Sequence, residues 1–228
     1  MRTLHAFVAI ACGALFVAAA SAGSVEVPVE VGGAYSVPVQ TLKERRLAGT
    51  VRQQRDYSCG SAALSTLLTN HYGDPVAEQQ VFDAMFALGD EARIQRDGFS
   101  LLDMKRYLAA RGYAANGFEA SLDSLAEAGL PAIALIDERG YHHFVVIKGI
   151  RDGRVVIGDP AEGTRVMTLE AFAARRVNSI LFVIDGQQQL AQFNRDADWA
   201  VLPHAPLAGR LDVAGSIATL PRLGPSDF

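Results

Sequence analysis

Residues 141–160 read YHHFVVIKGIRDGRVVIGDP, and more than any other stretch they indicate the architecture of this chain. Runs rich in Val and Ile on both sides of Asp152-Gly153 predict two strands, because β-branched side chains favour extended backbone. Asp152-Gly153 is a hairpin-turn signal, so the two strands run antiparallel. Pro160 ends the second strand, because proline has no N–H to extend a ladder. The stretch therefore predicts an antiparallel hairpin.

This hairpin brings ionisable side chains to one end. Two histidines open the first strand and Asp159 closes the second. Side chains alternate along a strand, so His142 and His143 are expected on opposite faces. A plain two-residue turn pairs Asp159 with Val146, three residues from His143. We therefore expect a bulge, a longer turn or strand twist to bring Asp159 to His143.

The residues before the hairpin have the apolar spacing of helices. Helices are expected to begin at Cys59, at Asp74-Pro75, at Ser100 with its capping-box partner Asp103, and at Ser121. Strands are expected over 132–136, 143–150, 154–158 and 179–184. Helices first and an antiparallel sheet afterwards indicate an α+β fold, with N-terminal helices packed on a small antiparallel sheet.

The first residues have the pattern of a secretory signal peptide over 1–22. Arg2 precedes an apolar stretch that ends in Ala20-Ser21-Ala22, a small-x-small cleavage signal. The apolar stretch is short and rich in alanine for a membrane span, so we expect cleavage after Ala22, with an uncleaved anchor as the alternative. After cleavage, no segment is expected to span a membrane.

The remaining chain divides into three expected parts. Alternating valines around Gly32-Gly33 predict a hairpin, which with a linker makes residues 23–46. Residues 47–185 form the expected main domain, although residues 40–58 are polar and expected to be irregular. Residues 186–228 form a C-terminal tail that wraps onto the domain or extends from it.

Composition narrows the class of protein. Half of the 228 residues are hydrophobic, which is enough for a core without metal or oligomerisation. The net charge of −4 and the lack of a basic run argue against nucleic acid as the principal ligand. The charged cluster Lys43–Arg46 is interpreted as a solvated face or a contact for an acidic partner. The 2 cysteines exclude a disulfide scaffold and a cysteine-rich zinc site.

One cysteine remains once the predicted signal peptide is removed. Cleavage after Ala22 takes Cys12 away and leaves Cys59. An exported chain with a single cysteine cannot form an internal disulfide, so this residue is either a small buried hydrophobe or a nucleophile. The start of a helix favours a thiolate, because free backbone N–H groups and the helix dipole stabilise negative charge there.

A cysteine nucleophile needs a base, which is usually a histidine oriented by a third group. His71 lies three turns along the same helix as Cys59, which is too far for a hydrogen bond to the thiol. His204 lies in the proline-containing C-terminal part, outside the expected main domain. The sequence therefore favours the pair His142-His143, with Asp159 at the same end of the hairpin. For His142 itself, a surface or packing role is favoured.

The motifs follow the order Gln53, Cys59-Gly60, His143 before Phe-Val-Val, and Asp159-Pro160. This order resembles family thirty-nine of the papain-like cysteine peptidases, the bacteriocin-processing peptidases that cut after double-glycine leaders, over roughly residues 47–185. The resemblance implies a papain-like cysteine protease fold. It also implies Cys59 as nucleophile, His143 as general base, Asp159 as the orienter of that base, and Gln53 in the oxyanion hole.

The chain departs from the family pattern in two ways. The family commonly has Asp directly before the cysteine, where this chain has Ser58. The chain carries no phosphate-binding loop or transmembrane bundle, so it resembles stand-alone exported members, such as those encoded with bacterial functional-amyloid (Fap-type) secretion systems. Gln54 is the alternative to Gln53, because a one-residue difference in the loop would exchange them.

The resemblance implies a periplasmic cysteine endopeptidase that acts on a protein or peptide substrate, expected to be a secreted one, and that needs no cofactor or metal. Such an enzyme would support secretion or assembly of a surface, amyloid-type protein. Two other interpretations remain open. The same triad can hydrolyse cell-wall peptides, or the papain-like domain can be a non-catalytic module that binds and guides a secreted partner.

Overall fold

The structure is a computed structural model, and it describes residues 23–29 and 33–202. The expected signal peptide, Gly32, His204 and the rest of the C-terminal end lie outside the described residues. The chain divides into two units between Thr41 and Leu42. In the first unit, β1 (Gly23–Val29) and β2 (Gly33–Val39) pair antiparallel along their whole length, as the valine alternation predicts.

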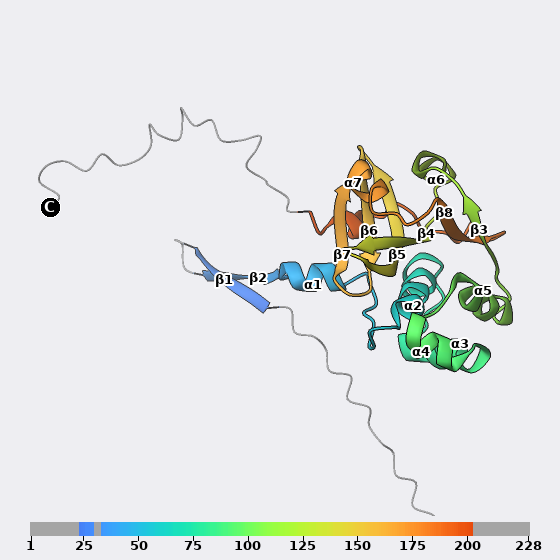
Figure 1. The fold of residues 1–228 in the computed structure, drawn as a ribbon. Coiled ribbons are helices and arrows are strands. Elements are labelled where there is room, and N and C mark those ends of the chain that lie inside the picture. The colour runs from blue at the N-terminus through green and yellow to red at the C-terminus, as the bar shows by residue number, and fades with distance from the viewer. Residues whose placement is uncertain (1–22, 30–32, 203–228) are drawn as a thin grey trace, which may run out of the picture. The chain divides into compact units, whose positions relative to one another are not determined.

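The second unit begins with helices (Figure 1). These are α1 (Leu42–Leu47), α2 (Cys59–His71), α3 (Glu78–Leu88), α4 (Glu91–Asp97) and α5 (Leu101–Ala110). Helix α2 contacts α3 and α5 on one side and β4, β5 and β6 on the other. Its side chains are buried almost all round, including Leu64, Leu67 and Leu68, so α2 is a central helix and has no solvated face.

An antiparallel sheet of six strands follows, in the order β3-β8-β4-β5-β6-β7. Its strands are β3 (Ala114–Glu119), β4 (Ala132–Glu138), β5 (Tyr141–Arg151), β6 (Arg154–Asp159), β7 (Gly163–Thr168) and β8 (Ile180–Asp185). The remaining helices are α6 (Leu122–Ala128), α7 (Leu169–Ala173) and α8 (Asp196–Trp199). The expected α+β order, helices first and antiparallel sheet afterwards, is confirmed.

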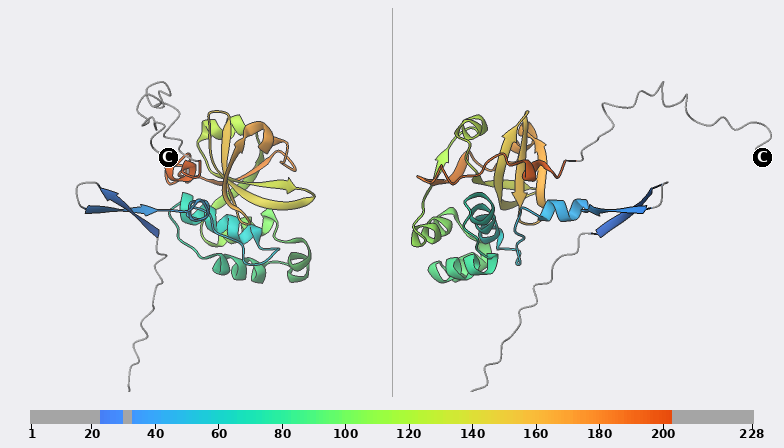
Figure 2. Two further views of the ribbon diagram at one scale, coloured as in Figure 1. Left: turned by 90° about the vertical axis from the view of Figure 1, so that its left-hand side faces the viewer. Right: turned by 180° about the vertical axis from the view of Figure 1, so that it is seen from behind.

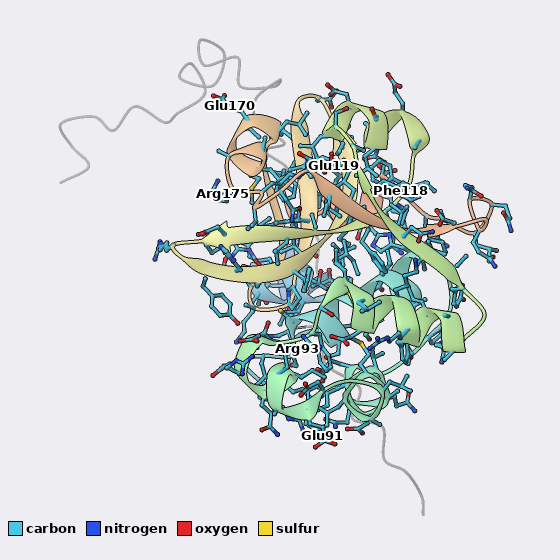
Figure 3. The ribbon with its side chains drawn as sticks, turned by 45° about the vertical axis from the view of Figure 1, so that its right-hand side comes forward. Glu91, Arg93, Phe118, Glu119, Glu170 and Arg175 are labelled. Carbon is cyan, nitrogen blue, oxygen red and sulfur yellow. The ribbon has the colours of Figure 1, made fainter. Side chains whose placement is uncertain are left out.

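Two hydrophobic clusters lie against the sheet. Phe144 and Val146 of β5 pack with α2, α3 and α5 in the first cluster. Val145 and Ile147 pack with α6 and α7 in the second. Figure 2 shows helices α2 to α5 gathered apart from α6 and α7. Figure 3 shows α4, with Glu91 and Arg93, at the opposite end from α7, which contains Glu170 and is followed by Arg175. Strand β5 is therefore buried on both faces from His143 to Ile150.

The β5–β6 hairpin turns at Asp152-Gly153, as predicted, and both residues have positive φ (52° and 67°), which a type I′ turn requires. Its register contains a bulge. Gly149 pairs with Val156 and Ile147 pairs with Ile157, so Lys148 is the extra residue.

The bulge changes the face on which Asp159 lies. Val146 pairs with Gly158, and continuing this register places Asp159 opposite Val145. Residues directly opposite share a face and alternate along each strand, so Asp159 joins the face of His143. Without the bulge, Asp159 would face the other way.

Several sequence-based expectations were wrong. The region 40–58 contains α1, and the helix expected at Asp74-Pro75 begins at Glu78. The Asp74 carboxylate instead accepts hydrogen bonds from Arg111 (2.6 Å) and from the hydroxyl of Tyr113 (3.2 Å). Elements that the sequence did not predict are α4, β3, β7 and α7. Each is short, so it has too few residues to display a clear hydrophobic period.

The described part of the C-terminal segment, through residue 202, wraps onto the second unit. The N–H of Gln192 donates to the carbonyl of His71 (2.8 Å), and a guanidinium nitrogen of Arg195 donates to the carbonyl of Asn70 (2.6 Å). Trp199 is buried, and the guanidinium of Arg151 lies over its ring at 4.4 Å. The end of α2 and the turn of the β5–β6 hairpin therefore both contact this segment.

His71 makes the stability of the fold depend on pH. Its Nδ1 donates to the carbonyl of Gln192 (2.6 Å), and burial lowers the pKa of His71 to about 4 from an ordinary 6.5. Between these values the unfolded chain binds a proton that the folded chain does not, so the free energy of unfolding falls as the pH drops. We expect His71 to contribute a loss of about 3 kcal/mol between about pH 7 and pH 4.

Urea unfolding of the wild type and His71→Gln at both pH values measures this loss. The Gln amide can still donate to the carbonyl of Gln192, so the variant is expected to fold and to show a flatter pH dependence. Exposed His142→Gln is the matched control. Equal pH dependence in the wild type and His71→Gln would contradict the prediction.

Candidate active site

Cys59 begins α2 and is buried, with 7% of its surface exposed. A tight turn precedes it, in which the hydroxyl of Ser58 accepts from the N–H of Arg55 (3.1 Å) and donates to its carbonyl (3.0 Å). Gly60 lets the start of the helix approach Phe99, because a Cβ at Gly60 would lie 2.9 Å from the Cβ of Phe99. The turn and the close packing together fix the position of the thiol.

Burial raises the pKa of the Cys59 thiol, and hydrogen bonds from backbone groups of Phe144 and Gly60 oppose this rise only in part. The expectation that the start of the helix favours a thiolate is therefore wrong for the thiol by itself, because desolvation outweighs the helix N–H groups. The thiol lies near the start of β5, because Cys59 lines the same cavity as Tyr141, the first residue of that strand.

His143 is buried on β5, and its Nε2 lies 3.1 Å from Oδ2 of Asp159. Its Nδ1 is buried and has no hydrogen-bond partner among the residues that the structure describes. Since the carboxylate occupies Nε2, Nδ1 is the nitrogen left to accept a proton. The structure therefore brings His143 and Asp159 together, as the hairpin predicted.

His142 points to the other side and is exposed, with Nε2 3.2 Å from Oδ2 of Asp137. The opposite placement of the two histidines is thereby confirmed. Asp137, one residue beyond the strand expected over 132–136, lies in β4, and its Oδ1 accepts the N–H of Gly140 (2.7 Å) in the β4–β5 turn.

The Asp159 carboxylate is held from several sides. Oδ1 accepts the N–H groups of Ala161 (2.8 Å) and Glu162 (3.2 Å), and Oδ2 accepts from His143 and from Arg165 (2.6 Å). Burial alone would raise the pKa of Asp159, but the hydrogen bond and charge of His143, the charge of Arg165 and the Ala161 N–H hold it below its usual value. Asp159 therefore remains a carboxylate at neutral pH and can fix the tautomer of His143.

Sequence reasoning missed Arg165. It lies on β7 opposite Ile157, and it also pairs with Glu138 (2.9 Å) and Glu162 (3.1 Å). Because Ile157 is two residues before Asp159, Arg165 lies on the same face as Asp159 and reaches it diagonally. Finding it required the strand β7, which the sequence did not predict.

Tyr141 was also missed, although the two-residue spacing to His143 on one strand is a signal for it. The two rings stack with centroids 5.8 Å apart. The Tyr141 hydroxyl donates to the carbonyl of Asp56 (2.6 Å), three residues before Cys59. Tyr141 thus joins the start of β5 to the loop that leads into α2.

Gln53 lies in this loop and is half-buried, whereas Gln54 is exposed. The N–H of Gln53 donates to the carbonyl of Pro160 (3.0 Å), which ties the loop to the residue after Asp159. Its Nε2 donates to the carbonyls of Arg55 (3.1 Å) and Asp56 (3.4 Å), and its Oε1 is buried without a hydrogen-bond partner among the described residues. The amide must therefore leave these carbonyls before it can donate to an oxyanion at Cys59.

A cavity of about 370 Å³ opens at the thiol. Its walls include Tyr57 and Cys59, Gly98 at the end of α4, and Tyr141. A peptide can therefore reach Cys59 from this side. Within the described part of the chain, no group of three or more His, Cys, Asp or Glu side chains could hold a metal ion.

The fold corresponds to that of known proteins. The solved peptidase domain of Streptococcus ComA, a bifunctional ABC transporter involved in quorum sensing, has the same fold, with a TM-score of 0.50 and 18% identity over 60% of this chain and 96% of that one. This is the papain-like fold. Residues 48–188 match the model of the Peptidase C39 family, so the chain belongs to that family and is a cysteine peptidase, a hydrolase that acts on peptide or protein substrates.

Two relatives share more of the sequence. The "Probable functional amyloid protease FapD" of Pseudomonas aeruginosa is 42% identical over 156 residues, which cover 68% of this chain and 69% of the relative. The protein of the same name from Pseudomonas fluorescens is 38% identical over 167 residues, covering 73% and 74%.

Proposed function

We propose that this peptidase is a periplasmic endopeptidase that cleaves an exported protein by a Cys-His-Asp mechanism. The observation that carries the proposal is the His143 side chain, whose Nε2 is held by Asp159 while its buried Nδ1 has no partner among the described residues. A base oriented in this way can activate a nearby thiol, and Cys59 lines a cavity together with Tyr141, two residues before His143.

In the proposed reaction, Nδ1 of His143 takes the proton of the Cys59 thiol, and the sulfur attacks the carbonyl carbon of the scissile peptide bond. Gln53 and a backbone N–H stabilise the oxyanion. The protonated His143 then gives its proton to the leaving amine as the C–N bond breaks. Water, deprotonated by His143, hydrolyses the thioester and returns the free thiol, while Asp159 keeps the ring oriented throughout.

The substrate class is argued from the relatives. Both are named as probable functional amyloid proteases, and this chain covers more than two thirds of each. We therefore propose that the substrate is an exported protein and that cleavage supports secretion or assembly of an amyloid-type surface protein. A cell-wall peptide substrate and a non-catalytic binding role are the competing outcomes of the test.

The proposed location follows from residues 1–22, with cleavage after Ala22. The mature chain would then consist of an N-terminal hairpin and linker through residue 46, the peptidase domain over 47–185, and a C-terminal segment. No helix in the described residues has the length and apolar content that a bilayer span requires.

The first prediction concerns the cysteine and its base. We expect Cys59→Ala and His143→Ala to abolish cleavage, because each removes a group that forms or breaks a bond. Comparing protein termini in the exported proteome of each strain with wild type measures this, and His142→Ala is the matched control that should retain all termini.

Other outcomes identify the alternatives. Unchanged protein termini with altered cell-wall cross-links in Cys59→Ala would indicate a cell-wall substrate. Loss of some protein termini in a strain that lacks this protein, with the same termini retained in the Cys59→Ala strain, would indicate a non-catalytic binding module. That result would overturn the catalytic proposal.

The second prediction separates the two glutamines. Loss of one oxyanion donor costs about 100-fold or more in kcat, so Gln53→Ala is expected to lose that much with little change in KM. Exposed Gln54→Ala should retain activity. Kinetics on a peptide spanning a cleavage site found by the proteome comparison measure both, and the reverse order of effects would assign the role to Gln54.

The third prediction concerns export. Mass spectrometry of the chain recovered from a periplasmic extract should find Gly23 as the first residue. Recovery of the chain with residues 1–22 attached to membranes would show an uncleaved anchor, and recovery only from the cytoplasm would contradict the proposed location.

A further inference from the structure

The bulge in β5 leaves backbone groups that the sheet does not satisfy, and the C-terminal segment contacts them. The N–H of Asn194 donates to the carbonyl of Lys148 (3.0 Å), and its side-chain Nδ2 donates to the carbonyl of Ile150 (2.9 Å). We refer to residues 192–199 as the strap. Asn194 adopts a positive φ of 58°, which Asn tolerates better than most residues.

A glycine makes this contact possible. A Cβ at Gly149 would lie 2.3 Å from Oδ1 of Asn194 and 3.0 Å from its Cα. Any side chain at this position would therefore push the strap off the bulge. Asn194 lies directly on the strand at the point where the register shifts.

The side chain of the extra residue is also held by the strap. Lys148 is fully buried, and its Nζ forms an ion pair with Oδ1 of Asp198 (2.5 Å). Nζ also donates to the carbonyl of Gly49 (2.8 Å) and to the hydroxyl of Thr164 (3.2 Å). Asp198 is in turn bound by Arg195 within the strap (2.8 Å and 3.0 Å). A buried ammonium needs such a partner, because desolvation of an unpaired charge is costly.

Lys148 connects the strap with the strand that carries Asp159. A Cβ at Gly158 would lie 3.2 Å from Cδ of Lys148, so the lysine stem crosses β6 one residue before Asp159. The contacts thus run without a gap from Asp198 through Lys148 to Gly158.

We propose that Asn194 and Asp198 are positioning residues of this peptidase, which hold the bulge at Lys148 and thereby keep Asp159 on the face of His143. The inference rests on the proposed Cys-His-Asp function. The strap lies beyond residue 188, where the match to the Peptidase C39 family ends, so the family domain does not include it.

Loss of the bulge would shift β6 by one residue and turn Asp159 away from His143. The imidazole would then lose the carboxylate that orients it, while the cavity at Cys59, whose walls include Tyr57, Gly98 and Tyr141, would keep its lining. We therefore expect loss of the bulge to lower the reactivity of the Cys59 thiol and to leave access to the thiol unchanged.

The experiment uses iodoacetamide as a probe of Cys59 in the full chain and needs no substrate. Alkylation is read from the peptide that contains Cys59, so Cys12 does not contribute. In the wild type, His143 takes the thiol proton, so alkylation is expected to remain fast below the pH at which an isolated thiol ionises. Asn194→Ala and Asp198→Asn are expected to lower the alkylation rate near neutral pH about 10-fold or more. The pH dependence of alkylation in these variants should be that of an isolated thiol.

The matched control lies in the same segment. Asp196→Asn removes an exposed carboxylate whose one ion pair within residues 33–202 is with Arg151 at the surface, so its alkylation profile should match the wild type. A parallel NMR measurement of the His143 ring nitrogens should show a fixed Nε2–H tautomer in the wild type and in Asp196→Asn, and tautomer exchange in the other two variants.

The outcomes distinguish the two proposals. A wild-type profile that already matches an isolated thiol would overturn the catalytic pair itself. Fast alkylation near neutral pH in the wild type and equally in Asn194→Ala and Asp198→Asn would overturn the proposed role of the strap. The proposed pair of Cys59 and His143 would then still stand. If Asp198→Asn does not fold, Asn194→Ala decides alone, because it leaves no buried charge without a partner.

Discussion

The register of the β5–β6 hairpin is the constraint on which the geometry of this site depends. Side chains on β5 and β6 alternate between two buried faces, so a register change of one residue turns Asp159 toward or away from His143. The extra residue Lys148 sets this register. The bulge alone decides that Asp159 faces His143. The contact from Arg165 to Asp159 and the hydrogen bond from Gln53 to Pro160 then stabilise that geometry.

Two groups of charged side chains lie around β6, each built on buried charges and completed by partly exposed partners, and we infer that their role is specificity more than stability. One joins Asp159, Arg165 and Glu138, and the other joins Lys148, Asp198 and Arg195. A buried ion pair gains little over a well-packed apolar pair, but removing one partner costs about 3–5 kcal/mol. Registers that separate these partners are therefore disfavoured. The charges act against wrong pairings of the strands.

The sequence was most informative where several local signals agreed. Asp152-Gly153 between Val-rich runs predicted the hairpin, and the positions of the histidines and of Asp159 at its ends predicted their meeting. The bulge could only be stated as one of three ways to close the gap, because a glycine within a strand, here Gly149, accompanies a bulge but also the close approach of another backbone. Arg165 and the strap were missed because their roles depend on β7 and on distant contacts, and neither has a strong period of its own.

The raised pKa of Cys59 fits the proposed chemistry better than the thiolate that the helix start suggested. Burial raises the pKa of the Cys59 thiol, and in the proposed reaction Nδ1 of His143, oriented by the Asp159 carboxylate, takes the thiol proton. Charge then forms by transfer between neighbours and needs no permanent buried anion at the sulfur, which would be costly. The oriented imidazole makes the reactive form accessible, so the placement of Asp159 matters more for reactivity than the helix dipole at Cys59 does.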